Sequence, residues 1–283
     1  MKGGKQLRSP SELEGIAREV RLDIFRMFRK SGTGHLAPAL SCADIFTTLY
    51  FFPIINWDIR FSEKRDRVIL SKGHACSALY AVLARAEYFP REDLLTFYQK
   101  NSLLGGHPNV NLRGIETATG ALGHGICFAT GTAMAAKLGG DSFRTYAVIG
   151  DGECEEGSVW EAAMFAANQK LDNLVVVVDN NTLQASDRVN DIAPLGELEK
   201  KWESFGWHVL RTDGHDFNRL CAAFAEAKET IEVPTVIIAD TVKGKGLGIA
   251  EDNKEWHSRA PKGDEWQTVL KDYGIDIKDL ETI

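Results

Sequence analysis

The first apolar pattern in the chain predicts an amphipathic helix from Ser11 to Lys30. Its apolar positions recur every three or four residues, at Leu13, Ile16, Ala17, Val20, Ile24, Met27 and Phe28. Ser11 and Glu14 have the spacing of a capping box, and Gly32 follows where the helix should stop. The next segment, 34–52, is rich in apolar residues and predicts a loop leading into a second helix.

Further along the chain, short runs of apolar and β-branched residues alternate with helical patterns. The runs expected to form strands are 67–71, 144–149, 173–179, 207–214 and 235–242. Between them, 72–86 and 120–140 are each expected to form a loop that leads into a helix, and 159–170 and 217–229 are expected to form helices. This alternation predicts an α/β fold, a doubly wound parallel sheet with helices on both faces. We find no repeat and no clear linker, so we expect residues 1–283 to form a single domain.

Composition narrows the class of protein. The 283 residues are 44% hydrophobic, which is enough for one large α/β domain. The net charge is −7, whereas a nucleic-acid-binding protein usually has a basic face. We find no apolar run long enough to cross a membrane and no secretory signal at the start. Five cysteines without a C-x-x-C pair argue against a zinc site or a disulfide framework, so we expect a cytoplasmic protein.

Candidate chemistry gathers in the loops that follow three predicted strands. In a parallel sheet, ligands bind beyond the carboxyl ends of the strands, where the loops after Ser71, Ile149 and Asp179 lie. The loop after Ile149 reads "GDGECEEG", with an aspartate between two glycines. No glycine-rich loop of the chain completes the G-x-G-x-x-G pattern, and the P-loop pattern is absent. The sequence therefore disfavours a dehydrogenase or an ordinary NTPase.

Two oxygen-bearing side chains at the ends of successive strands indicate a metal site. Asp151 lies within GDG, and Asn181 lies within "DNNTLQ" after the next buried strand. A few oxygen ligands in an open shell suit Mg²⁺, which prefers to share its shell with phosphate. Gly150 and Gly152 allow the backbone to approach a phosphate closely. Asp151 or Asn181 alone could simply cap a helix or form a turn, but the pair favours a diphosphate held through a metal.

These loops resemble the thiamine-diphosphate motif, in which GDG is followed by an asparagine near the end of the next strand. The wider chain is similar to transketolase, and especially to the amino-terminal subunit of split transketolases, from the first helix to about Pro261. The similarity rests on motifs in family order: "LSKGHACSALYAVL", "GGHPN", "GIETATGALGHGI", "GDGECEEG", "DNNTLQ" and "TVKGKG…WHSRAP". The resemblance implies the diphosphate-binding (PP-type) fold of thiamine-diphosphate enzymes.

The resemblance also implies a role for each matching residue. The implied ligands of Mg²⁺ or Ca²⁺ are Asp151, Asn181 and the carbonyl of Leu183. The implied contacts to thiamine diphosphate are His74, Gly120, Leu122, Gly152, Glu153, Asn181, Lys245 and His257. The implied catalytic residues are His35, His74, His107, His257 and Glu156, the last of which communicates between paired active sites in the family. His208 and His215 match nothing catalytic, and we expect them to be structural or exposed.

Histidine also suits this chemistry on physical grounds. Transfer of a ketol unit makes and breaks alkoxides near neutral pH, where imidazole can donate or accept a proton. Each histidine alone could simply sit in a loop. Four of the seven histidines lie in loops that match the family, which favours a shared role at the reacting carbon.

The resemblance covers only the diphosphate- and metal-binding half of a transketolase. It therefore implies a partner, the C-terminal transketolase subunit with the pyrimidine-binding domain, in an α2β2 assembly. We expect transfer of a two-carbon ketol unit from a ketose or its phosphate to an aldose or its phosphate. Two alternatives remain, namely transfer to a lipoyl or carrier-protein thiol, and a non-catalytic subunit that holds the cofactor. Ala37, Pro38 and His124 depart from the usual family residues, and the sequence does not identify the sugars.

Overall fold

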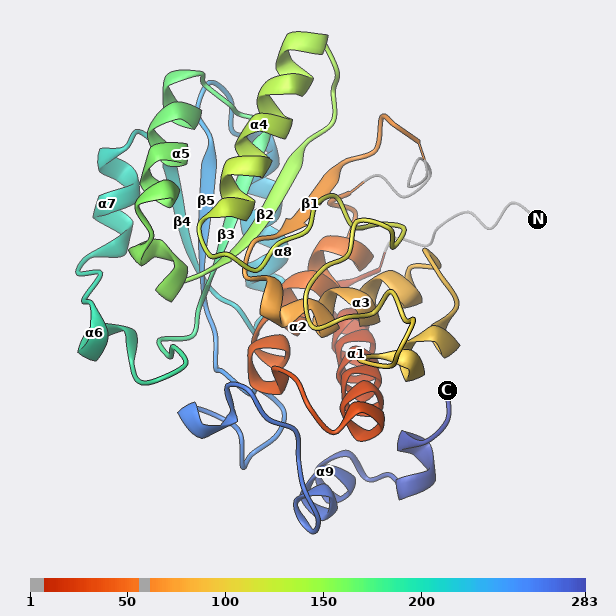
Figure 1. Ribbon diagram of the computed structural model, residues 1–283. Coiled ribbons are helices and arrows are strands. Elements are labelled where there is room, and N and C mark those ends of the chain that lie inside the picture. Colours follow the sequence, from red (N-terminus) through yellow and green to blue (C-terminus); the bar gives the residue numbers. More distant parts are fainter. Residues whose placement is uncertain (1–7, 56–61) are drawn as a thin grey trace.

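The computed structural model describes residues 8–55 and 62–283, and these residues form one five-stranded sheet (Figure 1). The strands are β1 (Arg67–Leu70), β2 (Thr145–Gly150), β3 (Leu174–Asn180), β4 (His208–Asp213) and β5 (Thr235–Asp240). Their order across the sheet is β1-β2-β3-β5-β4, and every neighbouring pair is parallel. In the centre, Val148 is aligned with Val177, and Val177 with Ile237. The predicted parallel sheet is confirmed.

The helices also follow the predicted order. The longer helices are α1 (Pro10–Ser31), α2 (Leu36–Phe51), α3 (Cys76–Arg85), α4 (His124–Gly139), α5 (Gly157–Asn168), α8 (Phe217–Glu229) and α9 (Glu265–Tyr273). The shorter ones are α6 (Val189–Ile192) and α7 (Leu198–Ser204), with 3-10 turns at Gly73–Ala75, Arg91–Thr96, Gly152–Glu155, Lys254–Trp256 and Ile277–Leu280. Helices α6 and α7 were not predicted, because they are too short to show a periodic apolar pattern.

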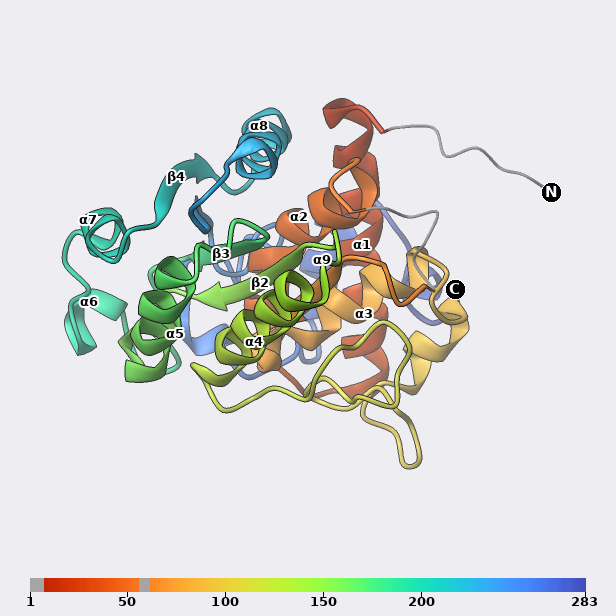
Figure 2. The same ribbon diagram turned by 90° about the horizontal axis from the view of Figure 1, so that it is seen from above.

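Helices cover both faces of the sheet, as a doubly wound fold requires (Figure 2). On one face, Tyr146 and Val148 of β2 belong to a core shared with α1, α2, α3 and α8. On the other face, Ala147 and Ile149 of the same strand pack with α4, α5 and α7, because side chains of a strand alternate between faces. The chain reverses its direction across the sheet between β4 and β5, and right-handed crossovers then place α8 on the opposite face from α5 and α7.

The start of α1 differs from the prediction. The N-cap is Ser9, whose backbone N–H donates to the Glu12 carboxylate at 2.8 Å, whereas Ser11 lies inside the helix. The predicted Ser11–Glu14 capping box is therefore wrong. Pro10 occupies the first helical position, where its fixed φ favours a helix start. Gly32 ends the helix as predicted, with φ at +67°.

A buried ion pair joins α1 to α2. Two guanidinium nitrogens of Arg21 each donate to one Asp44 carboxylate oxygen at 2.7 Å. The two side chains are 9% and 5% exposed. Burial would raise the pKa of Asp44, but Arg21 and His215 outweigh it and lower the pKa to about 2.

This pair should contribute to acid sensitivity. Because the folded-state pKa of Asp44 lies below its ordinary value of 3.8, its stabilising contribution is present above that pH and is lost as the pH falls toward about 2. We expect about 2 kcal/mol to be lost in this window, since one pKa unit corresponds to about 1.4 kcal/mol. Urea unfolding between pH 6 and pH 2 should show a steeper loss for the wild type than for Asp44→Asn. Parallel curves for the two proteins would contradict this assignment.

Two further properties bear on chemical class. Among the described residues, no helix is both long and apolar enough to cross a membrane. All five cysteines are free thiols, and Cys127 alone among them is exposed. Burial raises the pKa of the Cys154 thiol well above its ordinary value, so this cysteine of the acidic loop is not a ready nucleophile.

Candidate active site

The candidate site lies beyond the carboxyl ends of the strands, at the edge that the parallel sheet predicts. The segments that follow β1, β2, β3 and β5 contribute to it. The start of α2 and the long loop 105–123 before α4 approach from outside the sheet. Residues distant in the sequence therefore meet because parallel strands end at a common edge.

Four predicted histidines come together at this edge. The ring centroid of His35 lies 5.3 Å from that of His74, 6.3 Å from that of His107 and 5.4 Å from that of His257. The His74 and His257 centroids are 5.2 Å apart. Nδ1 of His35 is buried and has no hydrogen-bond partner among the residues that the structure describes. A buried polar atom without a partner is rare and indicates a place where a ligand could bind.

Three of these histidines have lowered pKa values. Burial is the main cause for His35, His74 and His257, and nearby lysines add to it. The pKa of His257 falls to about 3, and that of His74 falls well below its ordinary value. These imidazoles are therefore neutral near pH 7, and each can accept a proton as well as donate a hydrogen bond.

Asp151 is a buried carboxylate at the end of β2. It is 3% exposed, and its carboxylate accepts hydrogen bonds from the backbone N–H groups of Gly152 and Thr182. Within residues 8–55 and 62–283, no lysine or arginine forms an ion pair with it. Burial and the neighbouring Asp179 raise its pKa to about 6. A bound cation would stabilise the charged form of a carboxylate in this position.

The two other predicted metal ligands lie in the loop after β3. Asn181 is buried, and its Oδ1 accepts a hydrogen bond from the Leu183 backbone N–H at 3.2 Å. The Leu183 carbonyl accepts from Lys243 Nζ at 2.8 Å. Each oxygen has a second lone pair, so both remain available as ligands.

Lys243 is a site residue that the sequence analysis missed. It is 2% exposed, and its amine lies 2.8 Å from Nδ1 of His257 and 3.0 Å from the Gln184 carbonyl. Burial and Lys72 lower its pKa to about 7. The predicted residue, Lys245, is half-buried and supplies its backbone carbonyl to Arg21, so its proposed contact with phosphate remains a prediction. Both lysines belong to the motif "KGKG", so the sequence alone does not distinguish them. The path of the turn decides which of the two enters the site.

A second missed feature is the buried pair of Lys72 and Asp179. Lys72 Nζ lies 2.5 Å from Asp179 Oδ2, and the side chains are 3% and 0% exposed. Ser41 Oγ donates to the other Asp179 oxygen at 2.6 Å. Burial would raise the pKa of Asp179, but Lys72 and the hydroxyl groups of Ser41 and Thr241 lower it. The pair therefore links β3 to the loop that carries His74.

Removing the Lys72 amine should be costly. We expect Lys72→Met to lower the free energy of unfolding by about 3–5 kcal/mol, because it leaves the Asp179 charge buried and unpaired. Lys170→Met is a matched control, since its ion pair with Glu232 is more than 60% exposed on both sides. Urea unfolding measures both. A loss in Lys72→Met no greater than in Lys170→Met would show that the buried pair does not stabilise the fold.

Glu153 joins three segments of the site. Its carboxylate accepts from the backbone N–H groups of Gly123 at 2.8 Å and Gly150 at 3.1 Å, and from the Ser71 hydroxyl. These contacts tie the loops after β1 and β2 to the start of α4. A direct contact between Glu153 and the cofactor remains a prediction. Glu156, the exposed N-cap of α5, lies beside Gly123 at the same edge.

The glycines that are predicted to contact the cofactor lie in closely packed surroundings. A Cβ on Gly120 would lie 2.9 Å from the His107 ring, and one on Gly152 would lie 2.9 Å from the Gln184 side chain. Both positions therefore require glycine if the neighbouring side chains keep their places. Leu122 is half-buried, and its carbonyl lies 3.2 Å from Nδ1 of His124.

The residues that depart from the family pattern have different surroundings. Ala37 and Pro38 are buried in the first turn of α2, and the Ala37 carbonyl accepts from the Gly244 backbone N–H at 3.1 Å. His124 is exposed at the start of α4. Ala37 thus supports the turn that carries Lys243, whereas His124 lies at the surface.

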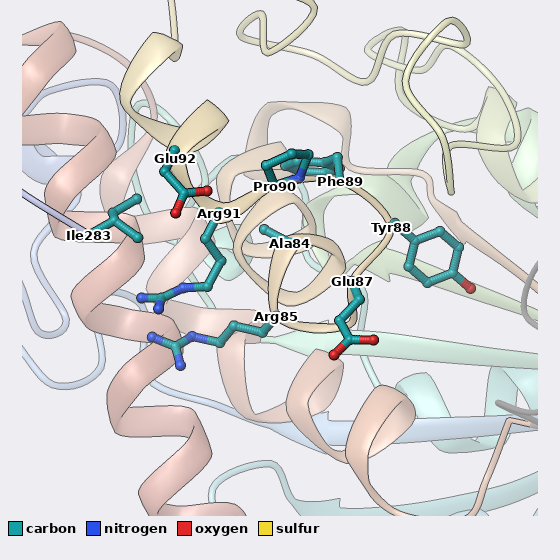
Figure 3. Close-up of a pocket in the computed structure, with 9 residues that line it drawn as sticks. All are labelled: Ala84, Arg85, Glu87, Tyr88, Phe89, Pro90, Arg91, Glu92 and Ile283. Carbon is teal, nitrogen blue, oxygen red and sulfur yellow. The ribbon is translucent and has the colours of Figure 1, made fainter. Parts of the chain in front are cut away.

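Two hollows are visible outside the histidine cluster. One, of about 640 Å³, lies at the end of α3 and is lined in part by Arg85 and Arg91 (Figure 3). Both arginines form ion pairs with Asp23 of α1, and no predicted site residue lines this hollow. The other, of about 600 Å³, borders Asp151 and Thr182 beneath α6 and α7. Of the predicted site residues, Asp151 alone lines the second hollow.

Known proteins resemble this chain over nearly its whole length. Residues 14–282 match the family described as "Transketolase, thiamine diphosphate binding domain". One subunit of the apulose-4-phosphate transketolase of Phocaeicola vulgatus is 37% identical over 270 residues, covering 95% of this chain and 96% of that protein. The transketolase of Homo sapiens is 39% identical over 265 residues, covering 92% of this chain and 42% of that protein.

A solved structure agrees with these relatives. The transketolase of Campylobacter jejuni has a TM-score of 0.84 and 30% identity to this chain, covering 94% of this chain and 43% of that one. The predicted family and fold are therefore confirmed. The chain belongs to the transketolase family and comprises its thiamine-diphosphate-binding domain.

Proposed function

We propose that this chain is the thiamine-diphosphate-binding subunit of a two-subunit transketolase. It would move a two-carbon ketol unit from a ketose or its phosphate to an aldose or its phosphate. The observation that carries the proposal is the convergence of four histidine rings, from four separate segments, with the buried Lys243 amine 2.8 Å from His257 Nδ1. The chain also covers nearly all of a relative that is named as one subunit of a transketolase, which supports the division into two chains.

The residues present fit a divalent cation. Asp151 offers a buried carboxylate that has no paired cation within the described residues, and Asn181 and the Leu183 carbonyl add neutral oxygens. Few oxygen ligands with room for phosphate and water are typical of Mg²⁺, and Ca²⁺ accepts the same donors. Asp151, Asn181 and Leu183 would hold the metal.

The residues present also fit a diphosphate. The Lys243 amine lies against His257 and the loop after β3, where an anion would offset the cost of its burial. Gly152 would bring its backbone close to the phosphates, and His74 lies beside His257. Gly120 and Leu122 would line the ring portion of the cofactor, next to His107.

The histidines would handle protons and sugar hydroxyls. Thiamine diphosphate, when bound, supplies the carbanion chemistry, and the protein supplies orientation and electrostatics. Neutral His35, His74 and His257 can each take a proton from a hydroxyl or return it. This capacity favours sugar substrates over transfer to a lipoyl or carrier-protein thiol. A non-catalytic subunit would not need this cluster.

The proposed partner is a C-terminal transketolase subunit with the pyrimidine-binding domain. Together the two chains would form an α2β2 enzyme in the cytoplasm. Native purification with intact-mass analysis should identify a stoichiometric companion of this kind. Ketol transfer with thiamine diphosphate and Mg²⁺ should require both chains. If the chain is recovered alone, and adding a pyrimidine-domain subunit gives no turnover, the proposal fails.

A further inference from the structure

A hydrogen-bonded network next to the site involves His215, a residue that the sequence analysis expected to be structural or exposed. His215 follows β4, and its Nδ1 lies 2.7 Å from Oδ2 of Asp44. Asp44 in turn binds both Nη atoms of Arg21. These three residues come from the turn after β4, from α2 and from α1, so they connect elements from opposite ends of the chain. We call Arg21, Asp44 and His215 the clamp.

The clamp holds the turn that carries Lys243 at two points. The Val242 backbone N–H donates to His215 Nε2 at 2.8 Å. Nε of Arg21 donates to the Lys245 carbonyl at 3.0 Å. One contact therefore precedes Lys243 in the chain and the other follows it.

The hydrogen-bond pattern gives His215 a single tautomer. Nε2 accepts from Val242, so in the neutral ring the hydrogen resides on Nδ1, which donates to Asp44. The Asp44 carboxylate thus accepts from His215 and from both Nη atoms of Arg21. A phenylalanine at position 215 would fill similar space but lose both hydrogen bonds. A glutamine could keep one donor and one acceptor.

Close packing leaves the turn little freedom while the clamp is intact. A Cβ on Gly246 would lie 2.9 Å from Arg21 Cδ and 2.7 Å from the Tyr273 hydroxyl. A Cβ on Gly244 would lie 2.3 Å from the Ala250 carbonyl. Arg21 therefore packs against the turn and also donates a hydrogen bond to it.

The Lys243 amine needs such a restraint. It is almost fully buried, and burying a charged amine away from water is costly unless an anion balances it. A free turn could relieve this cost by moving the amine toward solvent. A turn held on both sides of Lys243 keeps the amine beside His257 and the Leu183 carbonyl before any ligand arrives.

We propose that the clamp is a positioning device that holds Lys243 ready for a diphosphate group. The inference rests on the proposed function, because it assigns Lys243 to the diphosphate. Arg21, Asp44 and His215 are positioning residues that act through the Val242–Lys245 turn. The clamp would raise diphosphate affinity by removing the cost of ordering this turn on binding.

The test compares His215→Phe with His215→Gln in the full chain. Inorganic pyrophosphate with Mg²⁺ is the probe, and calorimetry measures its Kd. We expect His215→Phe to weaken binding about tenfold and His215→Gln to stay near the wild type, since lost preorganisation lowers affinity. His208→Phe is the matched control, because the only described partner of the His208 side chain is the exposed Glu226 carboxylate.

A double-mutant cycle separates positioning from general damage. In a Lys243→Met background, His215→Phe should cause no further loss of pyrophosphate affinity, because both changes act through the same amine. Additive losses, or equal affinity of His215→Phe and the wild type, would overturn the inference.

A second measurement keeps the test independent of the proposed function. Hydrogen exchange of residues 241–250 should be faster in His215→Phe than in the wild type, and unchanged in His215→Gln. If the wild-type chain does not bind pyrophosphate, the assignment of the diphosphate site fails, and exchange alone then decides whether the clamp restrains the turn. Equal exchange in His215→Phe and the wild type would overturn the clamp itself.

Discussion

His257→Ala should lower the turnover of the assembled two-subunit enzyme by about 100- to 10,000-fold, the range that a positioned proton-transfer group contributes. The centroid of the His257 ring lies 5.2 Å from that of His74 and 5.4 Å from that of His35, and its Nδ1 contacts the Lys243 amine. This contact leaves Nε2 as the atom that can exchange a proton with a substrate hydroxyl. Its pKa of about 3 keeps the ring neutral through the physiological range.

The same change should have little effect on folding. His257 is half-buried and follows a short 3-10 turn, outside the strands of the sheet. Steady-state kinetics and thermal melting should therefore separate, with a large fall in kcat and a small change in Tm. His208→Ala is the surface control and should retain activity. Comparable losses of melting temperature and activity in His257→Ala would favour a structural role instead.

Asp151→Ala should abolish metal-dependent binding of thiamine diphosphate, with at least about a 100-fold loss of affinity in the assembled complex. Loss of a ligand from a metal site removes much of the binding free energy, because the remaining donors are neutral oxygens. Calorimetry with Mg²⁺ and with a chelator measures the effect. The wild type should respond strongly to Mg²⁺, whereas the variant should bind equally weakly under both conditions.

The stability of the metal-free chain should not fall together with the affinity. Asp151 is a buried carboxylate with no paired cation in the described structure, so its removal should not destabilise the metal-free chain. Asp187→Ala, in the same loop system but exposed and paired with Lys254, is the control and should bind normally. Unchanged affinity of Asp151→Ala would remove the metal assignment, and severe unfolding would make Asp151 a structural residue.

Much of the fold could be predicted from local patterns. Apolar periodicity identified the longer helices, and β-branched runs such as 173–179 identified the buried strands, because both signals depend on neighbours in the sequence. The start of α1 was misplaced, since Ser9 with Glu12 and Ser11 with Glu14 offer similar spacings. Short α6 and α7 carry too few residues to show a period.

The candidate site, like the fold, could be predicted from the sequence only in part. Strand order predicted that Asp151 and Asn181 lie at one edge of the sheet, and the family resemblance implied a shared role for the four histidines. The structure brings the four histidine rings together. Their roles at the cofactor remain predictions. The pairing of Lys72 with Asp179 could not be read from the sequence, because the two residues are 107 positions apart.

The sequence by itself determined the class of fold, the order of its elements and the loops that carry the chemistry, because glycine turns and hydrophobic periods are local properties. Only the tertiary structure decided which lysine of "KGKG" enters the site. The choice of Lys243 depends on contacts from Arg21, Ala37 and His215 to the turn around it. These partners lie on α1, on α2 and after β4, and only folding brings them together.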